Sequence, residues 1–198
     1  MMKKRCKGTN MLREAKTFRR FYVFFSRISY FLNKKSLLLQ LMKKHLPFWA
    51  TMIGSGLGSG FWPWGPGTMG ALLATVVWLA LSLVLDAGAL WVVTLALAVV
   101  FTVLGTWATS RLEPYWGEDP SRVVVDEMVG VWVALLPCPY GSVGYALAAF
   151  VLFRFFDIVK PLGVRSLDRR RGAFWVMADD LLAGAYAAIV IILARWVI

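Results

Sequence analysis

Five acidic residues lie within or at the edge of apolar stretches of the chain, where an ionised carboxylate is costly. They stand in the segments "VVVDEMVG", "FRFFDIVKP" and "MADDLLAG", and they are Asp126, Glu127, Asp157, Asp179 and Asp180. A carboxylate in apolar surroundings is destabilising unless it is paired, protonated or bound to a metal. A cluster of oxygen ligands without a usable His or Cys suits Mg²⁺, a hard cation. The pattern therefore predicts a magnesium site.

The structural alternative is that these acids form ion pairs that lock helices together. The segment "FRFFDIVKP" places Arg154, Asp157 and Lys160 at three-residue steps before Pro161, which ends the helix. A metal ligand flanked by two phosphate-binding cations would have this spacing, and so would a ladder of surface ion pairs. Arg165 is a further candidate partner. Both interpretations fit this segment.

A glycine follows each of two acids by four residues. Gly130 follows Asp126, and Gly184 follows Asp180. Residues four apart lie on the same face of a helix, so each carboxylate stands one turn from a point where another helix can approach closely. The pattern predicts close helix packing beside the acids.

The uncharged loop "GSGFWPWGPGTMG" covers residues 58–70 and precedes a predicted helix at 71–85. It contains no Walker A sequence. Gly67 and Gly70 allow backbone amides to turn toward an anion at the helix N-terminus, and Thr68 stands at the predicted cap position. A phosphate cradle and a structural elbow fit the loop equally well.

The composition predicts an integral membrane protein of one domain. Of 198 residues, 59% are hydrophobic and the mean hydropathy is +0.65, which is too apolar for an ordinary soluble domain. Lipid cannot satisfy open backbone groups, so helices are expected. We predict a compact all-α membrane protein with four to five apolar helices and up to five crossings, in the stretches 71–85, 88–108, 123–138, 143–156 and 181–198.

The positive charge is concentrated at the N-terminus. Residues 1–50 hold thirteen of the 22 Lys and Arg but only one acid. We therefore predict that 1–48 is a basic aromatic extension, on the membrane surface or poorly ordered, and that 49–198 is the helical domain. A start at Met42 or Met52 is the alternative. Basic residues also occur in the loops 109–122 and 157–180, which places these loops and the acids on the cytoplasmic side.

Four segments in this order resemble the phosphatidylglycerophosphatase A family of bacterial lipid phosphatases. They are "GSGFWPWGPGTMGA", "VVVDEMVGVW", "FVLFRFFDIVKPLGVRSLDRR" and "ADDLLAG", so the resemblance covers about residues 50–195. It implies a compact helical body and Mg²⁺-dependent removal of the terminal phosphate of phosphatidylglycerophosphate in glycerophospholipid biosynthesis. It also implies a bacterial inner membrane location with the site facing the cytoplasm. The family usually has Ser where this chain has Ala71.

The resemblance also implies roles for individual residues. Asp126, Glu127, Asp157, Asp179 and Asp180 become the metal and catalytic acids, and Arg154, Lys160 and Arg165 become contacts to the substrate phosphate. Our hypothesis is that Asp126, Asp157, Asp179 and Asp180 bind Mg²⁺ and that Glu127 positions or deprotonates water. The amides of Gly67, Thr68 and Gly70 would complete the phosphate site. An aspartyl-phosphate intermediate is the alternative to direct attack by water.

Other phosphatase chemistries lack their residues here. The chain has no Cys-x₅-Arg loop and no DxDxT sequence, and His45 is its one histidine. Three further interpretations compete with the predicted enzyme: a phosphatase for another lipid phosphate, a small ion-conducting protein, and a structural membrane protein. No nucleic acid and no obligate protein partner are expected.

Overall fold

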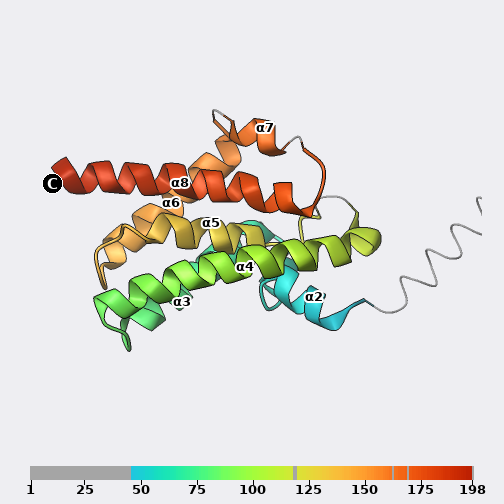
Figure 1. Ribbon diagram of the computed structural model, residues 1–198, viewed down its shortest axis with the longest axis horizontal. Coiled ribbons are helices and arrows are strands. Elements are labelled where there is room, and N and C mark those ends of the chain that lie inside the picture. The colour runs from blue at the N-terminus through green and yellow to red at the C-terminus, as the bar shows by residue number, and fades with distance from the viewer. Residues whose placement is uncertain (1–45, 118–119, 162, 169, 198) are drawn as a thin grey trace, which may run out of the picture. The chain divides into compact units, whose positions relative to one another are not determined.

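Helices form all the regular structure of the residues that the computed structural model describes, 46–117, 120–161, 163–168 and 170–197 (Figure 1). The helices are α2 (Phe48–Gly54), the 3-10 helix η1 (Ser59–Phe61), α3 (Pro66–Ser82), α4 (Ala87–Trp116), α5 (Val125–Leu135), α6 (Val143–Val159), α7 (Val164–Asp168) and α8 (Ala173–Val197). The prediction of an all-α protein is confirmed. The predicted N-terminal extension, 1–48, lies outside the described residues except for its last three.

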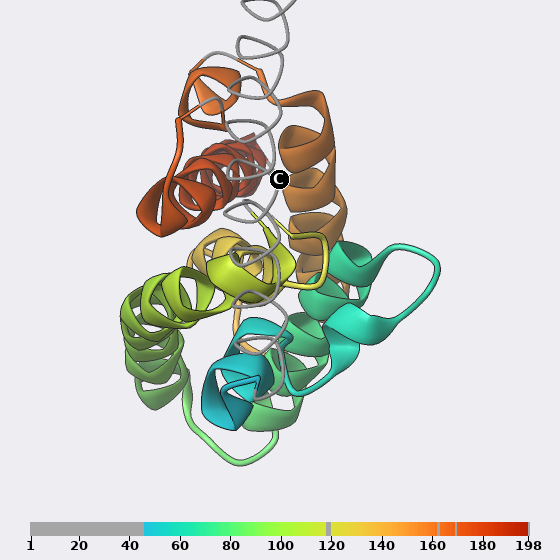
Figure 2. The same ribbon diagram turned by 90° about the vertical axis from the view of Figure 1, so that its right-hand side faces the viewer.

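Helix α5 is the centre of the helical domain. It packs against α3, α4, α6 and α8, and these helices surround it in Figure 2. Nine of its eleven residues are buried, and the indole N–H of Trp132 donates to the carbonyl of Ala74 in α3 at 3.2 Å. An eleven-residue helix is about 16 Å long, which is too short to cross a bilayer. The stretch 123–138 therefore forms a short core helix and is not one of the up to five predicted crossings.

Two helices within the described residues, α4 and α8, are long and apolar enough to span a membrane. They have 30 and 25 residues, whereas α3 and α6 have 17 each. Only 17% of the most apolar window of α4 is buried by the protein, so this helix presents most of its apolar surface outward. That exposure distinguishes α4 from the core helix of a soluble protein and supports a membrane protein.

The directions of the helices bring four of their ends together. Figure 1 shows that α5 and α8 run from right to left, so they begin on the side of the domain toward which α4 and α6 run. The predicted acids lie at these ends, with Asp126 in the first turn of α5 and Asp157 near the end of α6. Asp179 and Asp180 are in the first half of α8. The topology therefore gathers acids that are far apart in sequence.

Glycines allow α5 and α8 to approach closely. A Cβ on Gly184 would overlap the carbonyl oxygen of Gly130, and a Cβ on Gly130 would lie 2.8 Å from the carbonyl oxygen of Asp180. Such contacts admit no side chain at either position. The predicted close packing beside the acids is confirmed.

The start of α3 differs from the prediction. The helix begins at Pro66 and not at residue 71, and its N-cap is Gly65, which has a φ of 92° and makes no side-chain capping bond. Proline suits the first helical position because its fixed φ is already helical and it has no N–H to satisfy. Thr68 is consequently an exposed residue of the first turn and not the cap.

Candidate active site

A polar cavity of about 370 Å³ lies at the end of the domain where the four helices meet. Its lining residues are Thr109, Glu113, Asp126, Glu127, Asp157, Lys160, Arg170, Arg171, Gly172, Ala173, Val176, Asp179 and Asp180. All five predicted acids and one predicted cation, Lys160, are therefore in one cavity. Since these residues come from α4, α5, α6, α8 and the segment before α8, the site depends on the packed domain.

Three carboxyl groups form the tightest cluster of acids in the described residues. One oxygen each of Asp126, Glu127 and Asp180 lies within 4.8 Å of the others. Asp126 and Asp180 are only 6% and 4% exposed, and Oε2 of Glu127 is buried without a hydrogen-bond partner. The backbone N–H of Glu127 donates to Oδ1 of Asp126 at 3.1 Å. Buried carboxylates this close repel one another, and an oxygen-binding cation between them would remove the repulsion.

The remaining two acids form ion pairs. A guanidinium N–H of Arg154 donates to Oδ2 of Asp157 at 2.6 Å, and Nζ of Lys160 donates to Oδ2 of Asp179 at 2.9 Å. The tight cluster thus contains Glu127, whereas the sequence analysis predicted Asp157 and Asp179, and not Glu127, as ligands of the metal. Adjacent residues on a helix point about 100° apart, so Asp179 faces Lys160 when Asp180 faces α5.

Lys160 adopts an unusual backbone conformation. It caps the C-terminus of α6 with φ 47° and ψ 59°, the left-handed region that few residues other than glycine adopt. Pro161 follows and prevents the helix from continuing. This turn directs the lysine side chain to Asp179 and the cavity. Strained backbone of this kind is concentrated at functional sites.

Burial determines the proton affinity of Glu127, which lies in the first turn of α5 and outside both candidate spans. Removal of its carboxyl group from water raises its pKa to about 7. The hydrogen bond with Asp126 acts in the opposite direction, and the nearby charge of Asp180 raises the pKa further. Near neutral pH, this group can therefore exchange a proton or accept a cation.

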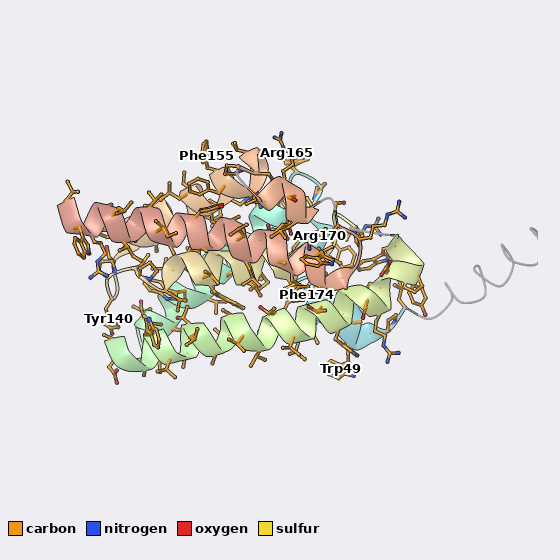
Figure 3. The ribbon with its side chains drawn as sticks, turned by 45° about the horizontal axis from the view of Figure 1, so that its top comes forward. Trp49, Tyr140, Phe155, Arg165, Arg170 and Phe174 are labelled. Atoms are coloured by element: carbon orange, nitrogen blue, oxygen red, sulfur yellow. The ribbon has the colours of Figure 1, made fainter. Side chains whose placement is uncertain are left out.

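Arg154 and Arg165, the other predicted cations, do not line the cavity. Arg154 is held against Asp157, with its guanidinium carbon 5.9 Å from the ring centre of Phe153. Arg165 is exposed and donates to the carbonyl of Val159 at 3.5 Å. Figure 3 shows its side chain projecting outward. In the structure, Arg154 therefore contacts Asp157 without lining the cavity, and Arg165 lies on the surface.

The glycine loop contacts the site from the side of α3. A Cβ on Gly67 would overlap the carboxyl group of Glu127, and one on Gly70 would lie 2.8 Å from Cβ of Val124. Both glycines thus make room for residues at the start of α5. These contacts favour the structural elbow over the phosphate cradle, because the loop packs against the Glu127 side chain.

The cavity also contains residues that the sequence did not indicate as site residues. Arg170 and Arg171 line it from the segment before α8, and the guanidinium carbon of Arg170 lies 4.3 Å from the ring centre of Trp175. Arg170 and Phe174 are both labelled in Figure 3, near the start of α8. Thr109 and Glu113 line the cavity from α4. The arginine run was visible as a basic loop, whereas a threonine in an apolar stretch carries no signal.

The fold and the site together define a class of protein. Clustered carboxyl groups that suit a divalent cation lie beside Lys160, Arg170 and Arg171, which can bind an anion, in a helical membrane protein. Divalent cations and basic side chains are the usual groups that stabilise a reacting phosphate. The class is that of a membrane-bound hydrolase of phosphate esters.

Comparison with known proteins identifies the family. The sequence profile described as phosphatidylglycerophosphatase A matches residues 52–195, and the chain belongs to this family of lipid phosphatases. The phosphatidylglycerophosphatase A of Haemophilus influenzae is 37% identical over 142 residues, 71% of this chain and 85% of the relative. That of Escherichia coli is 30% identical over 139 residues, 69% of this chain and 78% of the relative. The resemblance stated from the four segments is confirmed.

A third relative carries a different name. A Bacteroides thetaiotaomicron protein, provisionally named a phosphatidylinositol-3-phosphatase, is 56% identical over 157 residues, 78% of this chain and 99% of the relative. All three names describe phosphatases of phospholipids. No solved structure matches the chain.

Proposed function

We propose that this protein hydrolyses the terminal phosphate ester of phosphatidylglycerophosphate to give phosphatidylglycerol and inorganic phosphate. The observation that carries the proposal is the cluster of Asp126, Glu127 and Asp180 in one cavity with Lys160. The family and the names of two relatives supply the substrate. The same cavity would suit the terminal phosphate of a phosphoinositide, and the name of the Bacteroides relative makes that the second candidate.

The proposed cofactor is Mg²⁺. Asp126, Glu127 and Asp180 supply only oxygen ligands, and the buried Oε2 of Glu127 has no partner within the protein, so the residues fit a hard cation. Such an ion screens the charge of a phosphate and lowers the pKa of a bound water. Asp157 and Asp179 would then orient Arg154 and Lys160 and not bind the metal directly.

The protein's own side chains would do the rest of the chemistry. Lys160, Arg170 and Arg171 are positioned to bind the phosphate oxygens and to stabilise the charge that spreads over them during the reaction. Burial raises the pKa of Glu127 to about 7 in the metal-free protein, which suits a group that accepts a proton from the attacking water. The oxygen of that water would bond to phosphorus while its proton passes to a carboxylate oxygen of Glu127. The bond from phosphorus to the ester oxygen would break, and the leaving alkoxide would take up a proton from solvent water.

The exposed tryptophans of α4 support a position of the site at the surface of the membrane. Trp91 and Trp107 are both exposed and stand sixteen residues apart, about 24 Å along the helix. Tryptophan favours the interface between lipid and water, and the exposed residues between these two are apolar. Thr109 and Glu113 lie just beyond Trp107, so the cavity would be at the level of the phospholipid head groups. The proposed compartment is the cytoplasmic face of a bacterial inner membrane.

The test of the proposed reaction is a comparison of substrates. The purified full chain in detergent would be given phosphatidylglycerophosphate, phosphatidylinositol 3-phosphate and phosphatidate, each over a range of surface concentrations, and phosphate release would be measured. The proposal predicts the highest kcat/KM for phosphatidylglycerophosphate. A higher value for phosphatidylinositol 3-phosphate would establish the second candidate, and hydrolysis of none of the three would contradict both.

A further inference from the structure

Thr109 is the one helical threonine among the buried residues described whose hydroxyl group has no hydrogen-bond partner. It lies in α4, is only 2% exposed, and its Oγ1 makes no bond within the protein. A buried hydroxyl without a partner destabilises a fold, so native structures seldom contain one. The position of this side chain therefore needs a reason.

Other threonines of the same helix make a hydrogen bond that Thr109 does not make. Oγ1 of Thr94, Thr102 and Thr106 each donates to the carbonyl four residues earlier, at 2.6 to 2.8 Å. This is the usual way to satisfy a helical threonine. The corresponding acceptor for Thr109 would be Gly105, but no such bond forms, and its side chain lines the acidic cavity instead.

The packing of α4 places Thr109 at the site. Gly105, one turn earlier on the same face, is so close to α8 and α5 that a Cβ would lie 2.9 Å from Sδ of Met177 and 3.0 Å from Val125. Thr109 therefore enters the cavity one turn beyond a close contact of α4 with the two helices that carry Asp126 and Asp180. A hydroxyl group there can donate to an anion that enters the cavity.

We infer that Oγ1 of Thr109 donates a hydrogen bond to a non-bridging phosphate oxygen of the bound substrate. The inference rests on the proposed function, and it adds a positioning residue from α4, a helix that contributed none of the predicted site residues. The carboxylates of the cavity are acceptors, as is a phosphate oxygen, whereas Thr109 offers a neutral donor. Its Oγ1 would gain its missing partner only when substrate is present.

The test replaces Thr109 with valine, which has the same shape and no hydroxyl group. Because the lost hydroxyl has no partner in the free protein, Thr109→Val should keep or raise the apparent midpoint of thermal unfolding. A hydrogen bond to a charged group contributes enough that kcat/KM should fall roughly tenfold to a hundredfold. Thr109→Ser should recover most of the loss. Thr94→Val is the matched control, since Thr94 is buried in the same helix but bonded to Leu90; its kcat/KM should stay within about threefold.

A second measurement separates this inference from the proposed function. Binding of inorganic phosphate to the full chain at saturating Mg²⁺ would be measured by calorimetry for the wild type, Thr109→Val and Thr94→Val. We expect at least about tenfold weaker binding in Thr109→Val alone, with no change in the Mg²⁺ concentration for half-maximal binding. Failure of the wild type to hydrolyse phosphatidylglycerophosphate would defeat the proposed reaction, while phosphate binding would still test Thr109. Full activity and unchanged phosphate binding in Thr109→Val, or equal losses in Thr109→Ser, would overturn the inference.

Discussion

Gly184 of α8 lies against the carbonyl oxygen of Gly130 in α5, so closely that a Cβ at position 184 would overlap that oxygen. The two helices begin at the same end of the domain, and each glycine stands one turn beyond an acid of the cluster, Asp126 or Asp180. The contact between the glycines therefore determines how far apart the two carboxyl groups are.

Enlarging Gly184 should separate the two helices and disrupt the site. In Gly184→Ala the added methyl group meets backbone, which cannot move aside as a side chain can, so we expect a loss of about 1–3 kcal/mol of stability and at least about tenfold lower activity. Thermal unfolding and phosphate release would be measured together. Gly144→Ala is the control, because a Cβ there meets nothing within 4 Å; a helical Gly→Ala change at such a site is neutral or stabilising. Wild-type activity in Gly184→Ala would contradict the spacing role.

The raised pKa of Glu127 predicts how the stability of the metal-free protein depends on pH. Burial raises this pKa to about 7 from 4.5, so the folded protein keeps a proton that the unfolded chain has already released. The stabilisation is complete below pH 4.5 and is lost as the pH rises through 7. In EDTA, the unfolding midpoint should therefore fall by roughly 5 °C between pH 6 and pH 8.

A substitution and the addition of Mg²⁺ test whether Glu127 causes this pH dependence. Glu127→Gln cannot ionise, so its unfolding midpoint should change much less between pH 6 and pH 8. Since Mg²⁺ competes with the proton, the ion should stabilise the wild type more at pH 8 than at pH 6. Identical pH profiles for the wild type and Glu127→Gln would show that another group is responsible.

Part of this site could be predicted from the sequence, because the patterns that indicate it lie within short segments of the chain. Asp126 and Gly130, and likewise Asp180 and Gly184, are four residues apart, and that spacing alone places each pair on one helix face. Which acids face one another depends on how each packed helix is rotated. For that reason Glu127 and not Asp179 joins the tight cluster.

Other features depend on contacts that the sequence does not reveal. The short length of α5 reflects its burial among four helices, and its apolar residues resemble those of a membrane span. The start of α3 had a local signal, since Pro66 suits the first helical position, but Thr68 was the more conventional cap. Thr109 is one threonine among several in α4 and differs from them only in its missing hydrogen bond.

The ion pair of Lys160 with Asp179 predicts a strong effect of removing the lysine charge. Lys160→Met would remove a proposed phosphate contact and leave Asp179 without its ammonium partner, so kcat/KM should fall at least about thirtyfold. Arg165→Met is the matched control, because Arg165 is exposed and does not line the cavity. The proposed assignment fails if Arg165→Met is the more damaging change.

The proposed orientation predicts which residues a membrane-impermeant maleimide reaches in intact cells. Ser121 and Val143 are exposed at opposite ends of the domain, and a variant without Cys6 and Cys138 would receive one new cysteine at a time. Ser121→Cys should react only after the cells are made permeable, and Val143→Cys should react in intact cells. The opposite labelling pattern would place the cavity on the outer face.

The central claim is that Asp126 and Asp180 would hold a divalent cation on which hydrolysis of the phosphate ester depends. The most direct measurement is phosphate release from phosphatidylglycerophosphate in Mg²⁺ and in EDTA, for the wild type, Asp126→Asn, Asp180→Asn and Asp86→Asn. Asp86 is an exposed N-cap of α4, and asparagine caps equally well, so this control should keep full activity. We predict release that requires Mg²⁺ and falls at least about a hundredfold in Asp126→Asn and Asp180→Asn. Release that continues in EDTA, or that survives both substitutions, would contradict the account.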